Sequence, residues 1–325
     1  MTLHISEAEA RAVLTMPMAV EAVEAISRKQ ATGEVVVHPR RRFELPGGGF
    51  FHYMAAADFS LGFVAMKQYT FVRGKLRFLV PIYEMSTGDL LALIEADYMG
   101  QLRTGAASGV ATKYLARKDA SVAAIIGTGG QAKTQLEAVA TVRKLESARA
   151  YGRDAAKCEK FSEEMAKRLG IPVHICSSAA EAVHGADIVS TATTASQPVV
   201  FGANLSPGAH INAIGANHAH KRELDDEAVA SADIIVVDSV EQSRQEAGDL
   251  IIAFHGDESC WTGVKKLSEI VAGNASGRTS DTEVTLFKSN GIASWDLAVA
   301  IKVYAMAREK GLGRELPLWS DGAKG

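Results

Sequence analysis

The sequence has few cysteines and no surplus of positive charge. Only Cys158, Cys176 and Cys260 occur in 325 residues, and they form no Cys-x-x-Cys pair. Sparse, separated cysteines argue against a disulfide framework and indicate free thiols, so we expect a cytoplasmic protein. The 35 basic residues are balanced by 38 acidic residues. This balance disfavours a dedicated nucleic-acid-binding protein, because neutralising phosphates needs a basic excess.

Long apolar runs are also lacking. No uninterrupted apolar stretch reaches the roughly 18 residues that a membrane-spanning helix needs, and residues 1–30 lack the charged-then-apolar profile of a secretion signal. Hydrophobic residues nevertheless make up 47% of the chain, which is enough apolar material to disfavour general disorder. Because one core rarely grows past about 250–300 residues, the length favours two domains. We expect neither a membrane partner nor a nucleic-acid partner.

The first third of the sequence is rich in strand patterns. Residues 6–9 form a capping box, and apolar residues at helical spacing then predict a helix that ends at Gly33. A helix of small residues is expected at 101–115. Strand-like stretches lie between these helices, separated by glycine-rich or charged turns, at 35–45, 50–54, 62–70, 76–83 and 90–94. These patterns predict a strand-rich α+β domain.

From residue 120 on, strand patterns alternate with helix patterns. Such alternation predicts a parallel sheet with helical crossovers. A C-terminal helix at 295–310 is expected to pack on the N-terminal unit. The predicted fold class is therefore α/β, with a Rossmann dinucleotide-binding domain at 119–294 and a strand-rich domain formed by residues 1–118 plus 295–325.

A glycine-rich turn follows the first strand of the alternating region. Residues 127–132 read Gly-Thr-Gly-Gly-Gln-Ala, which fits Gly-x-Gly-x-x-Ala between an apolar strand and a helix. The first glycine permits the tight turn, and the second lets the backbone approach a pyrophosphate. The helix N-terminus supplies amide donors for phosphate. A plain strand-to-helix turn is the alternative, but the context favours a dinucleotide site that includes Gly127, Gly129, Gly130 and Gln131.

The end of the next strand bears on the choice of cofactor. NAD sites usually place Asp or Glu there for the ribose 2′-hydroxyl, whereas NADP sites favour Arg for the 2′-phosphate. Gly152 and Arg153 follow Tyr151, which favours NADP(H) and leaves NAD(H) open. Asp154 lies one position further on and is expected to cap the following helix. For Arg153, an exposed turn residue is the alternative interpretation.

Several cations of the N-terminal domain lie in apolar surroundings. Arg40 and Arg42 would share one face of a strand, with Arg41 on the other face. Lys67 interrupts an apolar strand, and Arg103 begins a helix of small residues. A cation in apolar surroundings is costly unless it meets an anion, and both residue types suit a carboxylate. Each alone is more often a surface or ion-paired cation, but Lys67 and Arg103 are the preferred candidates for a carboxylate pocket.

Histidines offer weaker signals. His52 is expected to be a hydrogen-bonded strand residue. His218 and His220 form a His-x-His pair that could ligate zinc, but no third ligand is placed nearby, so we expect no metal.

Taken together, several stretches resemble the ornithine cyclodeaminase/mu-crystallin family over essentially the whole chain. The resemblance is carried by residues 96–108, 127–132, 210–217, 221–225 and 287–291. It implies a homodimer in which the strand-rich domain, completed by the C-terminal helix, binds the substrate and forms the dimer. It also implies that the active site lies in the cleft between this domain and the Rossmann domain.

The resemblance implies roles for individual residues. The family's cations that hold the substrate carboxylate match Lys67, Arg103 and an arginine among residues 40–42. Other expected substrate contacts are His52, Asn217 and Ser289. Further expected cofactor contacts are Thr104, Arg153, Asp154, Thr193, Thr194, Ile214, Asn217 and Lys288.

Two departures narrow the implied activity. Cyclodeaminases of the family carry an aspartate where this chain has Asn217 and a glutamate near His52, and these acids handle amino groups and proton transfers. Without them, we expect an oxidoreductase acting on CH–NH or CH–NH₂ groups. It would use NAD(P)H to reduce a cyclic ketimine such as pyrroline-2-carboxylate or piperideine-2-carboxylate, or an imine of a 2-oxo acid, to an L-amino acid. Lys67 and Arg103 are the expected catalytic residues, with Lys67 as the candidate proton donor.

Two alternatives stay open. One is an ornithine or lysine cyclodeaminase that recycles NAD within each turnover. The other is a non-catalytic NADPH-dependent binding protein of the mu-crystallin type.

Overall fold

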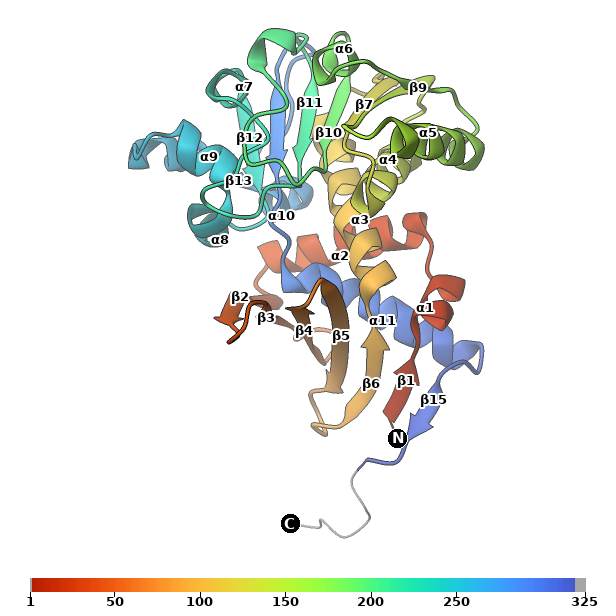
Figure 1. The fold of residues 1–325 in the computed structure, drawn as a ribbon. Helices are drawn as coiled ribbons and strands as arrows, with labels where there is room; N and C mark the ends of the chain where they lie inside the picture. Colours follow the sequence, from red (N-terminus) through yellow and green to blue (C-terminus); the bar gives the residue numbers. More distant parts are fainter. Residues whose placement is uncertain (1, 319–325) are drawn as a thin grey trace. The chain divides into compact units, whose positions relative to one another are not determined.

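The structure is a computed structural model and describes residues 2–318. It contains two compact units (Figure 1). One comprises the described residues up to Arg103 and from Ile292 on, and the other comprises Thr104–Gly291. The first boundary lies inside helix α3 (Asp97–Leu115), whereas the sequence patterns set it at the end of that helix. Among the described residues, no helix is long and apolar enough to cross a membrane.

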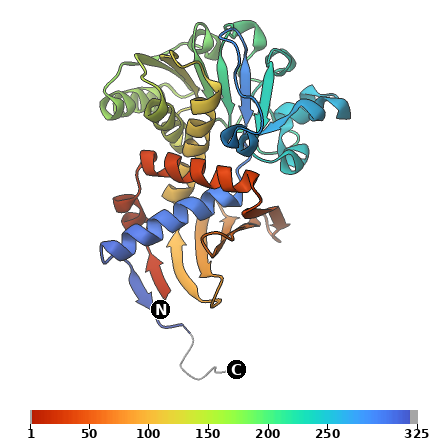
Figure 2. The ribbon, with the colours of Figure 1, turned by 180° about the vertical axis from the view of Figure 1, so that it is seen from behind.

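The first unit is built on a seven-stranded mixed sheet. The strand order is β15-β1-β6-β5-β4-β3-β2, and β2 to β6 form an antiparallel meander. Helix α11 (Ala293–Glu309) packs against β2 to β5, and α2 (Met16–Ala31) packs along α11 (Figure 2). The strands are β1 (Thr2–Ile5), β2 (Val35–Glu44), β3 (Phe50–Asp58), β4 (Phe63–Val72), β5 (Lys75–Glu84), β6 (Leu90–Glu95) and β15 (Arg314–Leu316).

The N-terminal helix expected to continue to Gly33 was predicted wrongly, because it is two helices. α1 (Glu7–Val13) begins at the predicted capping box, and α2 begins at Met16 after an extended break. A continuous helix would press the ring of Pro17 against the carbonyl of Val13 and would need an N–H that proline lacks. In the first turn of α2 neither problem arises, since that N–H would have no partner in the helix. The short strands β1 and β15 were not predicted.

The second unit is an eight-stranded parallel sheet. Its order is β13-β12-β14-β11-β10-β7-β8-β9, and every pairing in it is parallel (Figure 1). The chain runs outward from β7 to β9 and then returns to β10 on the other side of β7, as in a doubly wound sheet. The strands are β7 (Val122–Ile126), β8 (Ser147–Tyr151), β9 (Val173–Ile175), β10 (Ile188–Thr191), β11 (His210–Ala213), β12 (Ile234–Val237), β13 (Lys265–Lys266) and β14 (Thr285–Lys288).

Helices cover both faces of this sheet. Along β7, Ala123 and Ile125 join one core cluster and Ala124 and Ile126 join the other, because successive strand residues point to opposite faces. The first cluster includes apolar residues of α4 and α5, and the second includes residues of α6, α7 and α9. The helices are α4 (Gly130–Val142), α5 (Ala155–Leu169), α6 (Ala179–Val183), α7 (Asp226–Ala230), α8 (Val240–Glu246), α9 (Gly248–Ala253) and α10 (Leu267–Ala272). The predicted Rossmann-type α/β architecture is confirmed, although α8 to α10 were not anticipated.

Candidate functional site

The glycine-rich turn lies at the carboxyl end of β7 and leads into α4. Gly127 has φ +112°, and a Cβ there would lie 2.5 Å from the carbonyl oxygen of Ala192, so only glycine fits. Gly129 is the N-cap of α4, and an added Cβ there would meet nothing within 4 Å. No side chain caps this helix N-terminus. The first-turn amides therefore face open space with the positive end of the helix dipole behind them, which suits a pyrophosphate.

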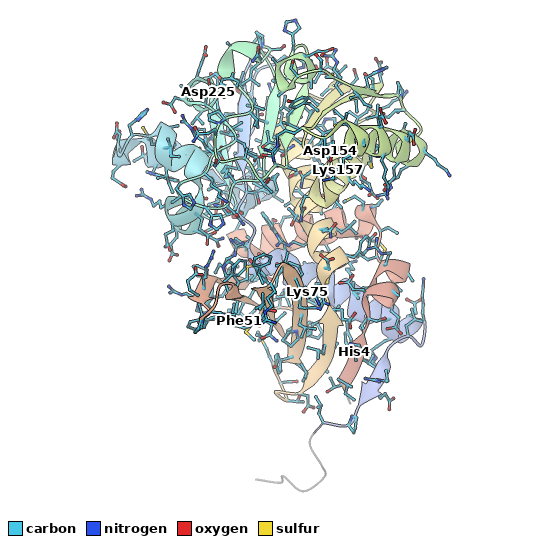
Figure 3. All side chains as sticks on the ribbon, in the orientation of Figure 1. His4, Phe51, Lys75, Asp154, Lys157 and Asp225 are labelled. Carbon is cyan, nitrogen blue, oxygen red and sulfur yellow. The ribbon has the colours of Figure 1, made fainter. Side chains whose placement is uncertain are left out.

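The end of β8 is crowded around Gly152, near the position at which an NAD site usually carries an acid. A Cβ on Gly152 would lie 2.9 Å from Thr128 Oγ1 and 3.0 Å from Cys158 Sγ. Arg153 is exposed. Asp154 is the N-cap of α5, accepts the N–H of Lys157 at 3.1 Å and lies 3.4 Å from the Lys157 ammonium (Figure 3). The predicted capping role of Asp154 is confirmed, and this capping bond lowers its pKa.

Glu223 forms hydrogen bonds with both loops that follow β10 and β11. Its fully buried carboxylate accepts hydrogen bonds from the hydroxyls of Thr191 and Thr193, each at 2.7 Å. It also accepts the N–H groups of Thr193 and Gly215 at 2.7 Å and of Ala216 at 3.3 Å. One side chain thus sets the shape of two loops at the sheet edge where ligands bind. Sequence reasoning included Glu223 in the 221–225 stretch but missed its role.

Lys288 supports the same loops from the interior. Its ammonium lies 2.8 Å from Asp249 Oδ2 and donates to the carbonyl of Ala216, and both charged side chains are fully buried. Asp249 Oδ1 in turn accepts the N–H groups of Glu223 and Leu224. In this arrangement Lys288 holds the loop backbone and does not present its charge at the surface.

The turn after β14 is held by a buried acid. Asp238 Oδ2 accepts the hydroxyl of Ser289 at 3.1 Å and the N–H groups of Asn290 and Gly291 at 2.7 and 2.6 Å. Burial raises the pKa of Asp238 against the lowering effect of these bonds. Among the other predicted contacts, Thr194 is exposed, and Thr104, Gln131, Ile214 and Asn217 are half-buried.

Two predicted catalytic residues meet a third, unpredicted one in the first unit. Lys67 comes from β4, Arg103 from α3 and Asp296 from α11. Asp296 Oδ1 lies 3.0 Å from Lys67 Nζ and 3.0 Å from Arg103 Nε, and all three side chains are at least nine-tenths buried. Sequence reasoning missed Asp296. The signal that could have found it is an acid inside the otherwise apolar stretch Trp295–Ile301.

The surroundings of Lys67 favour loss of its proton. Burial, the charge of Arg103 and, more weakly, the charge of Arg40 lower the pKa of Lys67 to about 8, while Asp296 raises it. The Lys67 ammonium lies 5.3 Å from the centre of the Phe78 ring. At Gly100 a Cβ would approach it to 3.1 Å, so the absence of a side chain there leaves room for the ammonium.

Two of the three arginines of β2, Arg40 and Arg42, are placed differently. A β-bulge between residues 38 and 41 shifts the register at Arg40, whose charge acts on Lys67. Arg42 pairs with Glu44 at 2.5 Å, and its guanidinium stacks 4.3 Å above the Phe50 ring. The structure therefore brings Arg40 toward the Lys67 cluster and gives Arg42 partners of its own.

His52 is buried next to this cluster on the same sheet. Its Nδ1 forms a hydrogen bond with the hydroxyl of Tyr69, and the two rings meet edge to face. Tyr69 also packs on Phe78, the ring beside Lys67. The expected hydrogen-bonded strand histidine is thus observed, on the side of the sheet that carries Lys67.

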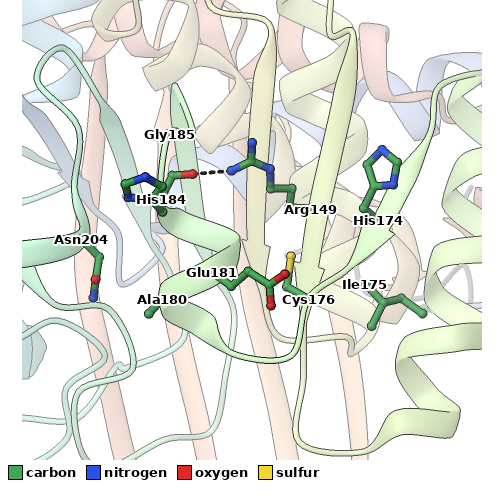
Figure 4. A pocket seen from close by; sticks show the side chains of 9 residues that line it. All are labelled: Arg149, His174, Ile175, Cys176, Ala180, Glu181, His184, Gly185 and Asn204. Carbon is green, nitrogen blue, oxygen red and sulfur yellow. Dashed lines mark hydrogen bonds between the residues drawn. The ribbon is translucent and has the colours of Figure 1, made fainter.

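A cavity of about 650 Å³ opens between β8, β9 and α6 (Figure 4). Within it, the guanidinium of Arg149 donates to the carbonyl of His184. None of the predicted substrate or cofactor residues lines it. Its lining consists of Arg149, His174, Ile175, Cys176, Ala180, Glu181, His184, Gly185 and Asn204. Across residues 2–318, no three His, Cys, Asp or Glu side chains are grouped so that they could hold a metal ion.

The sequence profile of the ornithine cyclodeaminase/mu-crystallin family matches residues 3–311. The chain belongs to this family. The resemblance inferred from the sequence motifs is therefore confirmed over nearly the whole chain.

Named relatives include reductases and dehydrogenases. A Δ1-pyrroline-2-carboxylate reductase of Bacillus cereus is 41% identical over 239 residues, which is 73% of each chain. The structure of Thermococcus litoralis Δ1-pyrroline-2-carboxylate reductase in complex with NADH and L-proline has a TM-score of 0.92 at 38% identity, covering 97% of this chain and 100% of that one. An archaeal alanine dehydrogenase dimer with bound NAD has a TM-score of 0.91 at 34% identity, covering 98% and 99%.

Proposed function

We propose that this chain reduces a cyclic 2-imino acid, with Δ1-pyrroline-2-carboxylate as the first candidate, to the corresponding L-amino acid. The chain is then an NAD(P)-dependent oxidoreductase acting on CH–NH groups. The observation that carries the proposal is the buried group of Lys67, Arg103 and Asp296, in which two cations share a single carboxylate oxygen. Because two cations face one carboxylate, the group has a net positive charge that can bind an anionic substrate. Similarity to pyrroline-2-carboxylate reductases supports the choice of substrate.

The second unit has residues that fit a dinucleotide. Gly127 and Gly129 leave space at the uncapped N-terminus of α4, where Gly130 and Gln131 begin the helix. These residues would hold the pyrophosphate, and the loops that Glu223 organises would border the nicotinamide end. A bound nicotinamide nucleotide supplies the hydride that the C=N carbon accepts. The chain's own residues bind the cofactor and orient the substrate.

Arg103 and Lys67 would bind the substrate carboxylate and supply charge. Arg103 uses Nε for Asp296, and its buried Nη1 has no hydrogen-bond partner among the described residues. A carboxylate from the substrate would satisfy that donor. Since a pKa of about 8 leaves Lys67 mostly protonated at neutral pH, its ammonium can bind the same carboxylate or protonate the imine nitrogen.

A panel of substrates tests the function. We expect oxidation of NADPH or NADH with pyrroline-2-carboxylate or piperideine-2-carboxylate, and weaker activity with pyruvate plus ammonia or methylamine. Ammonia release from ornithine or lysine without net cofactor consumption would instead identify a cyclodeaminase. Cofactor binding without turnover across the panel would identify a binding protein.

We further propose that Arg153 binds the 2′-phosphate and makes NADPH the preferred cofactor. The crowding at Gly152, which disfavours a larger side chain there, and the capping role of Asp154 support this assignment. The Arg153→Ser variant is expected to raise the KM for NADPH about 10-fold, the size of one charge-assisted hydrogen bond, and to leave the KM for NADH unchanged. Initial rates with both cofactors measure this. A wild-type protein that prefers NADH would contradict it.

We also propose a homodimer, which fits the archaeal alanine dehydrogenase dimer among the similar structures. The first unit exposes apolar side chains, such as Phe43, Phe59 and Leu61, that a dimer interface could bury. Light scattering on the purified protein should give twice the chain mass of 34.5 kDa. Cytoplasmic location stays a prediction from the composition.

A further inference from the structure

Asp296 is a buried charge in an apolar helix. Its side chain is 1% exposed, and its neighbours in α11 include Trp295, Leu297 and Val299, which are all fully or almost fully buried. Desolvating a carboxylate costs several kcal/mol unless cations and hydrogen bonds compensate for it. The compensation comes from two other elements, β4 through Lys67 and α3 through Arg103. Asp296 therefore connects three elements at one oxygen atom.

We propose that Asp296 is a positioning residue for the proposed reaction, because it fixes the Lys67 ammonium and the Arg103 guanidinium in one arrangement. This role rests on the proposed function. By taking Nε of Arg103, Asp296 leaves the Nη1 side of the guanidinium without a hydrogen-bond partner among the described residues. That side is the one a substrate carboxylate would bind. In this role Asp296 acts on the substrate through Lys67 and Arg103.

The charges around Lys67 explain why the acid is needed. Burial lowers the pKa of Lys67 most, and the charges of Arg103 on α3 and Arg40 on β2 lower it further, whereas the Phe78 ring on β5 carries no charge. Asp296 is the group that opposes them. Without it, Lys67 would face burial and two positive charges and would lose its proton near neutral pH. With it, the cluster keeps a net positive charge for an anionic ligand.

The Asp296→Asn variant tests the role, because the amide keeps the shape of the side chain and removes its charge. The pKa of Lys67 should then fall from about 8. We expect the alkaline limb of kcat/KM for imine reduction to move to lower pH by about one unit or more. The KM for the imino acid should rise about 10-fold, since Arg103 loses its anchor. NADPH affinity, measured by fluorescence titration, should not change.

Asp58→Asn is the matched control. Asp58 is a buried acid of β3 in the same unit, and it pairs with Lys29 at 2.9 Å, away from the Lys67 cluster. This variant should lower Tm without moving the alkaline limb. Asp296→Glu restores the charge and should return the limb to within a few tenths of a pH unit of wild type. The proposal would be overturned if the alkaline limb of kcat/KM moved equally in Asp296→Asn and Asp58→Asn, or if it moved in neither variant.

A second readout needs no substrate. Competitive acylation of lysines by acetic anhydride at a series of pH values, followed by peptide mass spectrometry, titrates Lys67 itself. We expect a pKa near 8 in wild type and Asp296→Glu, and a lower value in Asp296→Asn. If wild type reduces no imine but the pKa of Lys67 shifts as expected, the proposed function fails, whereas the electrostatic effect of Asp296 on Lys67 stands. If Asp296→Asn does not fold, a wild-type Lys67 that titrates near 10.5 still overturns the proposal.

Discussion

At the scale of single residues, buried cations carry most of the functional information. Lys67 and Arg103 could be noticed in the sequence as cations beside apolar residues, and Lys288 was expected from the family resemblance. The cost of burying a charge implies that each has a partner, but it does not say which residue that partner is. The structure supplies Asp296 for the first two and Asp249 for the third, from distant parts of the chain.

Replacing Lys67 tests its role most directly. Lys67→Met fills a similar volume without the charge, so the fold should be kept, while imine reduction should fall about 10²–10⁴-fold in kcat/KM. Steady-state kinetics measure the loss, and NADPH binding should be unchanged. Near-normal turnover in this variant would remove Lys67 from the reaction.

In the wild type, the same residue sets the pH dependence. In the proposed reaction the protonated form of Lys67 acts, and the pKa of this residue is about 8. The value of kcat/KM should therefore be level below that pH and fall tenfold per pH unit above it. A profile that stays level to pH 10 would contradict a role for the ammonium.

At the scale of elements, loops at the carboxyl ends of β10 and β11 form the candidate nicotinamide end. The strands themselves were predictable from apolar runs, but the loop shapes depend on Glu223. This residue lies near the end of the β11–α7 loop and accepts hydrogen bonds from both loops. Glu223→Gln replaces an acceptor with an NH₂ that faces N–H groups, so several of these bonds are lost. We expect about a 10-fold weaker Kd for NADPH, by fluorescence titration.

Asp187→Asn is the control for that prediction. Asp187 is also a carboxylate that accepts two backbone N–H groups, those of Ser121 and Val122, both at 2.9 Å. It precedes β10 and so lies at the amino-end edge of the same sheet, opposite the glycine-rich turn. The Asp187→Asn variant should be less stable than wild type but should bind NADPH with the wild-type Kd. Equal loss of affinity in both variants would mean that Glu223 acts through general stability.

At the scale of the whole molecule, stability should depend on pH through His210. This residue is fully buried between Thr285 and Asn212, and burial, followed by the charge of Arg278, lowers its pKa to about 3. The unfolded chain takes up a proton below about pH 6.5, whereas the folded chain stays neutral until about pH 3. The free energy of unfolding should therefore fall as pH decreases through this window. At pH 5 the loss from this group is about 2 kcal/mol.

Urea unfolding at pH 7 and pH 5 measures this effect. His210→Gln, which cannot titrate, should lose less stability between the two pH values than wild type. His255→Gln removes an exposed histidine, and its loss of stability between pH 7 and pH 5 should equal that of wild type. Identical pH dependence in wild type and His210→Gln would contradict the assignment.

Local patterns in the sequence were sufficient for the class of fold, most of its elements, the glycine-rich turn and the cations of the candidate site. Strands, crossovers and the turn at Gly127 depend on spacing along the chain and on backbone conformation, which neighbouring residues determine. The family was also recognisable, because its motifs are short and contiguous.

The partners of the buried charges depended on folding. Asp296 lies 229 residues from Lys67 and 193 residues from Arg103, and no local pattern links residues that far apart. The bulge at Arg40 and the role of Glu223 likewise follow from hydrogen bonding between elements. Electrostatic pairing in an interior is decided by which chain segments meet there, and only the folded chain brings those segments together.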